Sequence, residues 1–377
     1  MTTLAFTNGR MLTDNGFETN LSVLVEDGRI IAVVPGEPPK GAEVVDLAGR
    51  TLVPGFIDTQ VNGGGDVLFN DEPTVDGLRR IANAHRKYGT TGLLPTLISD
   101  DVDVMRRAID ATRDALAQGV PGVLGVHLEG PYLNAARKGV HDPSKFHTPD
   151  AAELDLVASL GTAGITLVTL APERFDAATL RALAQRGVII AAGHTAATYE
   201  QLRDGFANGI TGVTHLFNAM TPMNSREPGA VGAALENPDA WCGLIVDGYH
   251  VHDASLRVAI AARPRGKMML VTDAMPPVGG EREAFSLYGV EMICRDGQCT
   301  TADGTLAGSA LDMASAVRNT VQRLRLPLEE ACRMASQYPA QFIGLGGELG
   351  RIAPGYRADL VVLDDDLNVQ GTWIAGQ

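Results

Sequence analysis

Eight short runs rich in apolar and β-branched residues occupy the middle of the chain. In order they are FIDTQVN, GLLPTLIS, VLGVHLEG, ITLVTLAPE, VIIAAGHT, GVTHLFNAM, GLIVDGYHV and MMLVTDAM. Helical patterns lie between many of them, at residues 74–88, 103–118, 179–186 and 199–208. Parallel strands buried on both faces have this apolar character, so the α/β alternation predicts a parallel (β/α)8 TIM-like barrel over residues 54–345. A doubly wound open sheet is the alternative, because a sequence does not show closure.

Both ends of the chain have strand character instead. Residues 4–12, 21–36 and 42–49 alternate or run apolar, with Asn-Gly and Asp-Gly turn signals between them. The tail, 350–377, repeats this character. We therefore expect residues 1–53 and 346–377 to form one small β-sandwich domain into which the catalytic barrel is inserted. Residues 281–305 interrupt the barrel alternation and predict a β-hairpin excursion after the eighth strand.

Composition and charge argue against several classes of partner and several cellular locations. The net charge is −14, and no run of lysine or arginine is long enough to follow a phosphate backbone, so nucleic acid is not expected. The sequence has no signal-peptide pattern and no apolar run near the ~20 residues that cross a bilayer, which predicts a cytoplasmic protein without a membrane partner. The cysteines show no C-x-x-C pair and predict buried free thiols in a reducing compartment; they are Cys242, Cys294, Cys299 and Cys332.

Residues that can bind metals or move protons gather at the ends of the predicted strands. They are Gln60, Asn62, His127, Glu129, His194, His215, His250 and Asp273. Each alone has an ordinary explanation, such as a structural histidine or a helix-capping carboxylate. In a barrel, however, the carboxyl ends of the strands meet at one rim. Two imidazoles and a carboxylate there would leave a coordination position open, as in catalytic metal sites.

A set of motifs across nearly the whole chain carries a family resemblance. PGFID and PGYRADLVVLD are shared widely in the amidohydrolase superfamily, whereas HLEGP, GHT and THLFNAM are more specific. With them the chain resembles the N-acetylglucosamine-6-phosphate deacetylases. The resemblance implies hydrolysis of N-acetyl-D-glucosamine 6-phosphate to D-glucosamine 6-phosphate and acetate, in amino-sugar catabolism or cell-wall recycling. It also implies that Glu129, His194 and His215 bind one divalent metal per subunit, zinc or alternatively iron(II).

The same resemblance implies roles around that metal. Asp273 would be the general base and acid, and His141, in KGVHDP, would hydrogen-bond the acetyl carbonyl. The superfamily's second metal needs histidines where this chain has Gln60 and Asn62. Carboxamides are weak ligands, so that second site should be empty or weak.

The phosphate of the substrate needs local donors on an acidic protein. The resemblance assigns this task to Arg226, to His250 and to the backbone amides of Asn218 and Ala219. In the family some phosphate ligands reach in from a neighbouring subunit, so a homodimer is expected.

Other histidines have weaker assignments. We expect His85 to be structural, and His127 to be either a partner of the metal ligands or a plain hydrogen-bonded residue. No role is assigned to His147 or His252. Two rival functions stay open: an amidohydrolase for another N-acyl amine or a cyclic amide, and a non-catalytic scaffold. The intact set of Glu129, the two histidines and Asp273 argues against the scaffold.

Overall fold

The central architecture is an eight-stranded parallel barrel, seen in a computed structural model that describes residues 3–295 and 297–377. The first two residues of the predicted sandwich and residue 296 of the predicted excursion lie outside the described residues. Neighbouring strands follow chain order, with all seven ladders parallel. The strands are β8 (Phe56–Val61), β11 (Thr90–Ile98), β12 (Gly125–Glu129), β13 (Ile165–Leu170), β14 (Ile189–Ala192), β15 (Ile210–Val213), β16 (Trp241–Leu244) and β17 (Met268–Leu270).

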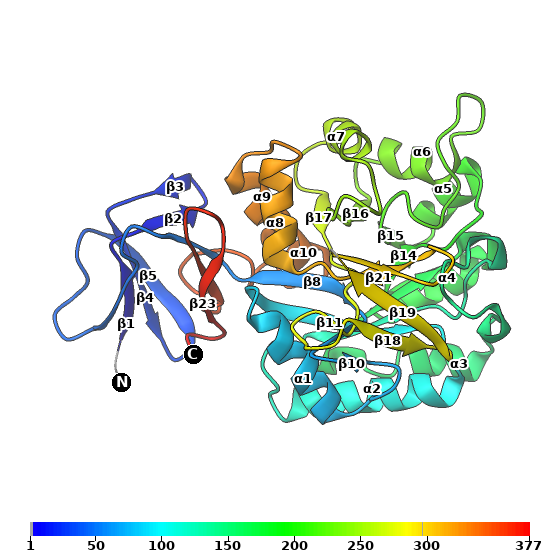
Figure 1. Cartoon of the computed structure of the whole chain (residues 1–377), viewed down its shortest axis with the longest axis horizontal. Coiled ribbons are helices and arrows are strands. Elements are labelled where there is room, and N and C mark those ends of the chain that lie inside the picture. The colour runs from blue at the N-terminus through cyan, green and yellow to red at the C-terminus, as the bar shows by residue number, and fades with distance from the viewer. Residues whose placement is uncertain (1–2, 296) are drawn as a thin grey trace.

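Helices surround these strands (Figure 1). They are α1 (Val75–Arg86), α2 (Val102–Ala117), α3 (Ala151–Val157), α4 (Ala177–Gln185), α5 (Tyr199–Ala207), α6 (Gly229–Glu236), α7 (Asp253–Ala261), α8 (Met313–Gln322), α9 (Leu328–Ala335) and α10 (Gln337–Phe342). Local sequence explains α1: the Thr74 side chain accepts from the Gly77 N–H, and Leu78 and Ile81 are buried at helical spacing. Helices therefore cover the barrel, as the alternating pattern predicts.

The barrel is closed where the first and last strands meet. The chain just after β17 returns to β8, with a bridge between Val61 and Ala274 and a hydrogen bond of 3.0 Å from the Asp273 N–H to the Gln60 carbonyl. The buried carboxylate of Asp58 adds bonds from the Thr272 hydroxyl (2.5 Å) and backbone N–H (3.3 Å). These contacts decide against the open-sheet alternative.

Strands from both chain ends lie together at one end of the molecule (Figure 1). One sheet has the order β5-β4-β1-β6 and the other β23-β22-β7-β2-β3, and both supply side chains such as Phe6, Leu52 and Leu360 to one hydrophobic cluster. The strands are β1 (Leu4–Thr7), β2 (Arg10–Thr13), β3 (Gly16–Glu18), β4 (Leu21–Glu26), β5 (Arg29–Pro35), β6 (Glu43–Asp46), β7 (Thr51–Pro54), β22 (Leu360–Leu363) and β23 (Val369–Trp373).

The excursion after β17 is larger than the predicted hairpin. It forms an antiparallel four-stranded sheet of β18 (Ala284–Leu287), β19 (Val290–Arg295), β20 (Gln298–Thr300) and β21 (Leu306–Ser309). A short pair, β9 (Gly63–Gly64) and β10 (Val67–Leu68), follows β8. The chain continues beyond residue 305 as a fourth strand because β21 bridges back to the barrel, where Ser309 lies opposite Ala274.

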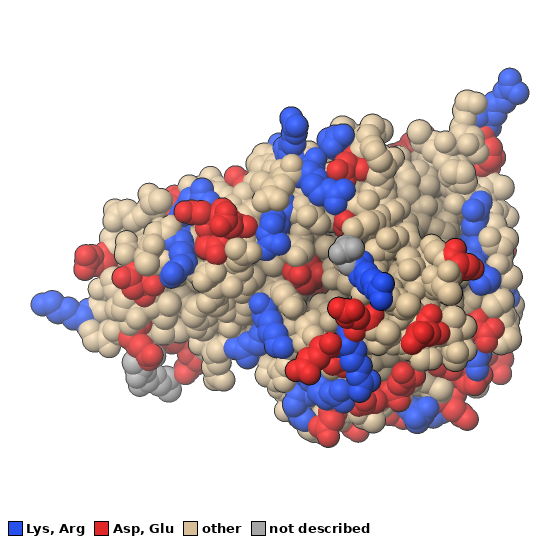
Figure 2. All heavy atoms as spheres, in the orientation of Figure 1, with Lys and Arg blue, Asp and Glu red and all other residues tan. Residues whose placement is uncertain are grey.

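The excursion sheet also corrects the expectation for the cysteines. Cys294 and Cys299 lie opposite each other on β19 and β20 and form a disulfide, whereas Cys242 and Cys332 are buried and free as predicted. The spacing of these two cysteines in the sequence does not indicate that they pair. They become neighbours only through the antiparallel register of the two strands. Within the described residues, no helix is long and apolar enough to cross a membrane. Figure 2 shows acidic and basic side chains interspersed on the visible face rather than a basic track.

Candidate active site

The carboxyl ends of the barrel strands open into a cavity of about 200 Å³. Glu129 ends β12, while His194, His215 and Asp273 follow β14, β15 and β17, and all four line the cavity. The backbone of His194, His215 and Asp273 has φ values of 47°, 31° and 54°. The left-handed region is uncommon for residues other than glycine, and such residues cluster at functional sites. A larger hollow of about 720 Å³ lies among the terminal strands, away from these side chains.

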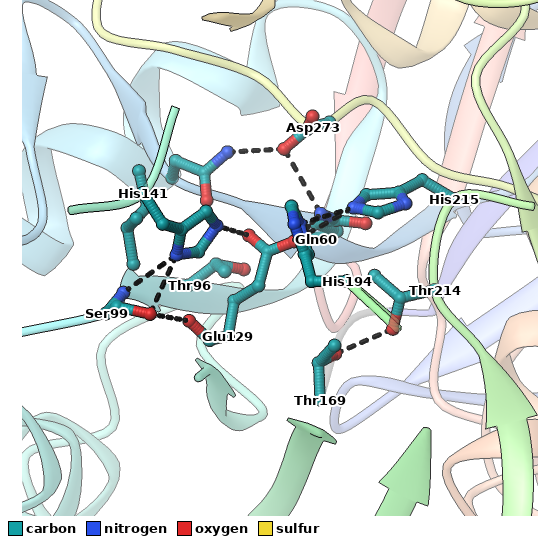
Figure 3. A network of polar contacts seen from close by, with 12 residues as sticks. Gln60, Thr96, Ser99, Glu129, His141, Thr169, His194, Thr214, His215 and Asp273 are labelled. Atoms are coloured by element: carbon teal, nitrogen blue, oxygen red, sulfur yellow. Dashed lines mark hydrogen bonds and ion pairs between the residues drawn. The ribbon is translucent and has the colours of Figure 1, made fainter. Parts of the chain in front are cut away.

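Three predicted metal ligands converge on one point (Figure 3). Glu129 Oε1 lies 3.2 Å from His194 Nε2 and 3.1 Å from His215 Nε2, and the two ring nitrogens are 3.1 Å apart. The side chains of all three are at most 7% exposed. The predicted set is therefore assembled in space, although its members are up to 86 residues apart.

The protonation of His194 makes this cluster fit a cation. Its Nδ1 lies 2.9 Å from the carbonyl oxygen of Arg137, which can only accept, so Nδ1 carries the proton. In the neutral ring, Nε2 then presents a lone pair to Glu129 and His215. Two imidazole nitrogens and a carboxylate oxygen at these separations suit a divalent ion that replaces their mutual contacts.

The pKa values of the two carboxyl groups in the site are shifted in opposite directions. Burial would raise the pKa of Glu129, but hydrogen bonds with His194 and His215 lower it well below its usual range. Burial and the nearby charge of Glu129 raise the pKa of Asp273 from 3.8 to about 6. Adjacent carboxyl groups are thus pushed in opposite directions, an arrangement typical of proton-transfer sites.

Gln60 and Asn62 lie beside Asp273 and bind it directly. The Asn62 Nδ2 donates to Asp273 Oδ1 at 2.6 Å, and the Gln60 Nε2 donates to the same oxygen at 3.1 Å. Gln60 also donates to Glu129 Oε1 at 3.0 Å. At this position the chain offers N–H donors instead of the imidazole ligands of a second metal.

His141 enters the same cavity from the loop after β12. Its ring is buried and lies tilted against that of His194, with 4.5 Å between the ring centroids and 60° between the ring planes. Burial and the neighbouring His194 hold its pKa well below the usual range, so the ring is neutral. The ligand-type atoms of Glu129, His141 and His194 also lie within 4.8 Å of one another, so distance alone does not decide which histidines hold a metal.

His250 also lines the cavity and is paired with Asp247. The His250 Nδ1 lies 2.6 Å from Asp247 Oδ2, while the backbone N–H groups of Tyr249 and His250 donate to Asp247 Oδ1. Burial would raise the pKa of Asp247, but its bonds with His250 lower it. The Asp247 carboxylate therefore holds the Nδ1 of His250 as a hydrogen-bond donor.

The other predicted phosphate ligands differ. Asn218 and Ala219 line the cavity, but the Asn218 backbone N–H already donates to the His215 carbonyl at 3.0 Å. For Ala219, no such partner is found in the part of the chain described. Arg226 is exposed and is not among the residues that line the cavity. The sequence motif around Arg226 does not predict this exposure, because a motif does not show the direction in which its loop points.

The remaining histidines have structural partners. His127 lies below the site, where it bonds the hydroxyls of Thr96 (3.2 Å) and Thr169 (2.7 Å), and burial lowers its pKa to about 4. His85 bonds the Gly63 carbonyl at 2.9 Å and is structural, as expected. His147 pairs with a glutamate, and His252 caps α7.

Sequence reasoning missed two residues that bind site histidines. Ser99 directly follows β11 and contacts His141, and Asp247 contacts His250. Ser99 obeys the rule that found the other candidates, since it ends the second apolar run. A serine carries a weak signal in a sequence, however, because it is common at strand ends and turns.

Known proteins are similar to this chain over almost its full length. The Amidohydrolase family model matches residues 51–377. The N-acetylgalactosamine-6-phosphate deacetylase of Shewanella sp. (strain ANA-3) is 41% identical, over 98% of this chain and 94% of the relative. The N-acetylglucosamine-6-phosphate deacetylase of Haemophilus influenzae is 36% identical, over 95% and 94%. A crystal structure of N-acetylglucosamine-6-phosphate deacetylase from Pasteurella multocida superposes with a TM-score of 0.96 at 35% identity, covering 99% and 98% of the two chains. The chain belongs to the amidohydrolase family.

Proposed function

We propose that this chain hydrolyses the acetamide of N-acetyl-D-glucosamine 6-phosphate, giving D-glucosamine 6-phosphate and acetate. The observation that carries the proposal is the convergence of Glu129, His194 and His215 beside Asp273 in one cavity. Relatives named for this reaction cover nearly the whole chain, which supports the same chemistry here.

In this proposal Glu129, His194 and His215 hold one divalent metal per subunit, zinc or alternatively iron(II). Such a metal supplies Lewis acidity, which activates water at neutral pH and polarises an amide carbonyl. Zinc and iron(II) both accept two imidazoles and a carboxylate, so the ligand set fits either.

Two side chains then act on the substrate. Asp273 accepts a proton from the attacking water and delivers it to the departing nitrogen. Its Oδ1 is held by Gln60 and Asn62, which leaves Oδ2 for this task. His141 donates a hydrogen bond to the acetyl oxygen, where negative charge develops. The donors at Gln60 and Asn62 also explain why a second metal would be absent or weak.

The phosphate is assigned to the far part of the cavity. His250, whose Nδ1 is held by Asp247, and the backbone N–H of Ala219 contact the phosphate in this assignment. Asn218 stays in the assignment through its side chain at the cavity wall. Arg226 is exposed, so we assign it to the cavity of a second copy in a homodimer, where its guanidinium would meet the phosphate.

One specific observation favours a second substrate. A relative at 41% identity is named for N-acetylgalactosamine 6-phosphate, which differs only in the configuration at one hydroxyl-bearing carbon. Both sugars present the same acetamide and the same phosphate to the residues above. The two therefore need to be tested side by side.

The testing experiment is acetate release by protein of known metal content. Its substrates are both N-acetylhexosamine 6-phosphates and unphosphorylated N-acetylglucosamine, with chelator-treated protein as the control. Preference for a phosphorylated sugar, with about one metal per chain, supports the proposal. Equal rates with the unphosphorylated sugar would instead indicate a broader N-acyl hydrolase and would remove His250 and Arg226 from their roles.

The strands of the two chain ends have a proposed role as well. We assign residues 1–53 and 346–377 to a small β-sandwich domain that leaves the barrel, 54–345, to carry the chemistry. Their separate hydrophobic cluster supports this division. Limited proteolysis that releases a folded barrel would test it.

A further inference from the structure

His141 has two ring nitrogens, and a neutral imidazole carries a proton on one of them. The structure distinguishes the two through their surroundings. The Nδ1 atom faces Ser99, whose hydroxyl lies 2.8 Å away and whose backbone N–H lies 3.3 Å away (Figure 3). A backbone N–H can only donate, so Nδ1 must accept. The proton of the neutral ring is therefore on Nε2.

Among the described residues, the Nε2 atom has no hydrogen-bond partner, and the ring lines the cavity. Its nearest acidic atom is Glu129 Oε2 at 3.9 Å, which is too long for a hydrogen bond. The ring is 3% exposed and lines the cavity. The Nε2–H is thus free to meet a ligand.

Ser99 is itself held from three sides. The Tyr288 hydroxyl, from the excursion sheet, donates to the Ser99 carbonyl, and the Asn70 side chain bonds both backbone groups of neighbouring Ile98. On the third side, a Cβ at Gly130 would lie 2.2 Å from Ser99 Oγ, so only glycine leaves room for this hydroxyl. The Ser99 hydroxyl also lies 3.3 Å from the Glu129 carbonyl oxygen, a second acceptor for its single proton, but the backbone N–H already requires His141 Nδ1 to accept, and the hydroxyl is closer to Nδ1, at 2.8 Å.

We propose that Ser99 is a positioning residue that holds His141 as the Nε2–H tautomer. His141 is thereby a neutral hydrogen-bond donor toward the cavity and not a metal ligand, because a ligating nitrogen needs a free lone pair. This separates His141 from His194, whose Nδ1 is held by a carbonyl acceptor and whose Nε2 is therefore free to ligate. The statement that the donor meets an acetyl oxygen rests on the proposed function; the tautomer does not.

The tautomer can be read directly by ¹⁵N NMR of zinc-loaded protein labelled at histidine side chains. The spectrum of the His141→Gln variant identifies the resonances of His141. We expect the proton on Nε2 and none on Nδ1. A proton on Nδ1, or a shift of Nε2 that follows zinc replacement, would overturn the proposal.

Kinetics test the positioning role separately. Ser99→Ala keeps the backbone N–H but removes the hydroxyl, so we expect a loss of about 3- to 10-fold in kcat, the effect of one neutral hydrogen bond, with little change in KM. Ser99→Thr should recover most of it. The matched control is Ser336→Ala, which removes another buried serine hydroxyl, bonded to the Cys332 carbonyl at 2.7 Å, far from the cavity.

Equal kcat in Ser99→Ala and Ser336→Ala would contradict a role for the hydroxyl. If neither sugar phosphate releases acetate but NMR finds the Nε2–H form, the proposed function fails and the tautomer assignment stands.

Discussion

His141 and His250 lie in the same cavity, yet different groups face their Nδ1 atoms. At His141 the neighbour is a serine with a backbone N–H, which donates, whereas at His250 it is the Asp247 carboxylate, which accepts. The first arrangement places the ring proton on Nε2, toward the cavity, and the second places a proton on Nδ1, toward Asp247. In the proposed function these two histidines contact different parts of one substrate, the acetamide and the phosphate. The group that contacts Nδ1 therefore decides whether that nitrogen of each histidine accepts or donates a hydrogen bond.

The most severe change at the amide end is Asp273→Asn. It should lower kcat by about 10³-fold or more, since an amide cannot take the proton from water, while the KM of the phosphorylated sugar changes little. Acetate release and metal content are the measurements. Near-normal turnover with metal retained would remove Asp273 from its role.

Asp273, which lines the cavity, and Asp247, which lies behind His250, should change the stability of chelator-treated protein in opposite directions as pH rises. Because the folded pKa of Asp273 is raised from 3.8 to about 6, the folded state holds more protons than the unfolded state between these values, and stability falls as pH rises through this window. The decrease is about 3 kcal/mol. Asp247 has a lowered pKa, so its stabilisation is present above pH 4 and is lost as pH falls through the folded value.

Urea unfolding at several pH values would check this contrast. Asp273→Asn should flatten the curve between pH 4 and 6, and Asp247→Asn should lower stability above pH 4. Identical pH curves for the two variants would contradict it.

At the phosphate end, Asp247→Asn should act on binding. Loss of a charge-assisted bond to His250 should raise the KM of the phosphorylated sugar by about 10- to 100-fold and leave the unphosphorylated sugar unaffected. Steady-state kinetics with both sugars provide the test. An equal effect on both would mean that Asp247 shapes the whole cavity.

The smallest effect is expected for Asn62→Ala. Removing the 2.6 Å bond to Asp273 Oδ1 leaves Gln60 as a second donor, so kcat should fall by about 3- to 10-fold. Asn208→Ala, at the half-buried C-terminal cap of α5 and not among the residues that line the cavity, is the control for a general effect of losing an asparagine. An unchanged kcat in the Asn62 variant would contradict a role for this donor in holding Asp273.

Much of the fold follows from local patterns. All eight predicted strands are present, and helices such as α1 and α2 lie within a few residues of their predicted ranges. The excursion was harder to predict, because the pairing of its fourth strand with β20 and the bridge of that strand to Ala274 depend on register, which the local pattern does not give. The Cys294–Cys299 bond was missed for the same reason, since only the register of β19 and β20 makes them neighbours.

The sequence by itself determined the order of strands and helices, the position of Glu129, His194, His215 and Asp273 at strand ends, and the replacement of two histidines by Gln60 and Asn62. These depend on periodicity and on residue type. Only the tertiary structure decided how the barrel closes, that Arg226 lies outside its own cavity, and which nitrogen of His141 carries the proton. Such features depend on which groups from distant segments face one another. A hydrogen bond between two distant segments corresponds to no regular spacing of residues in the sequence, so sequence patterns do not predict it.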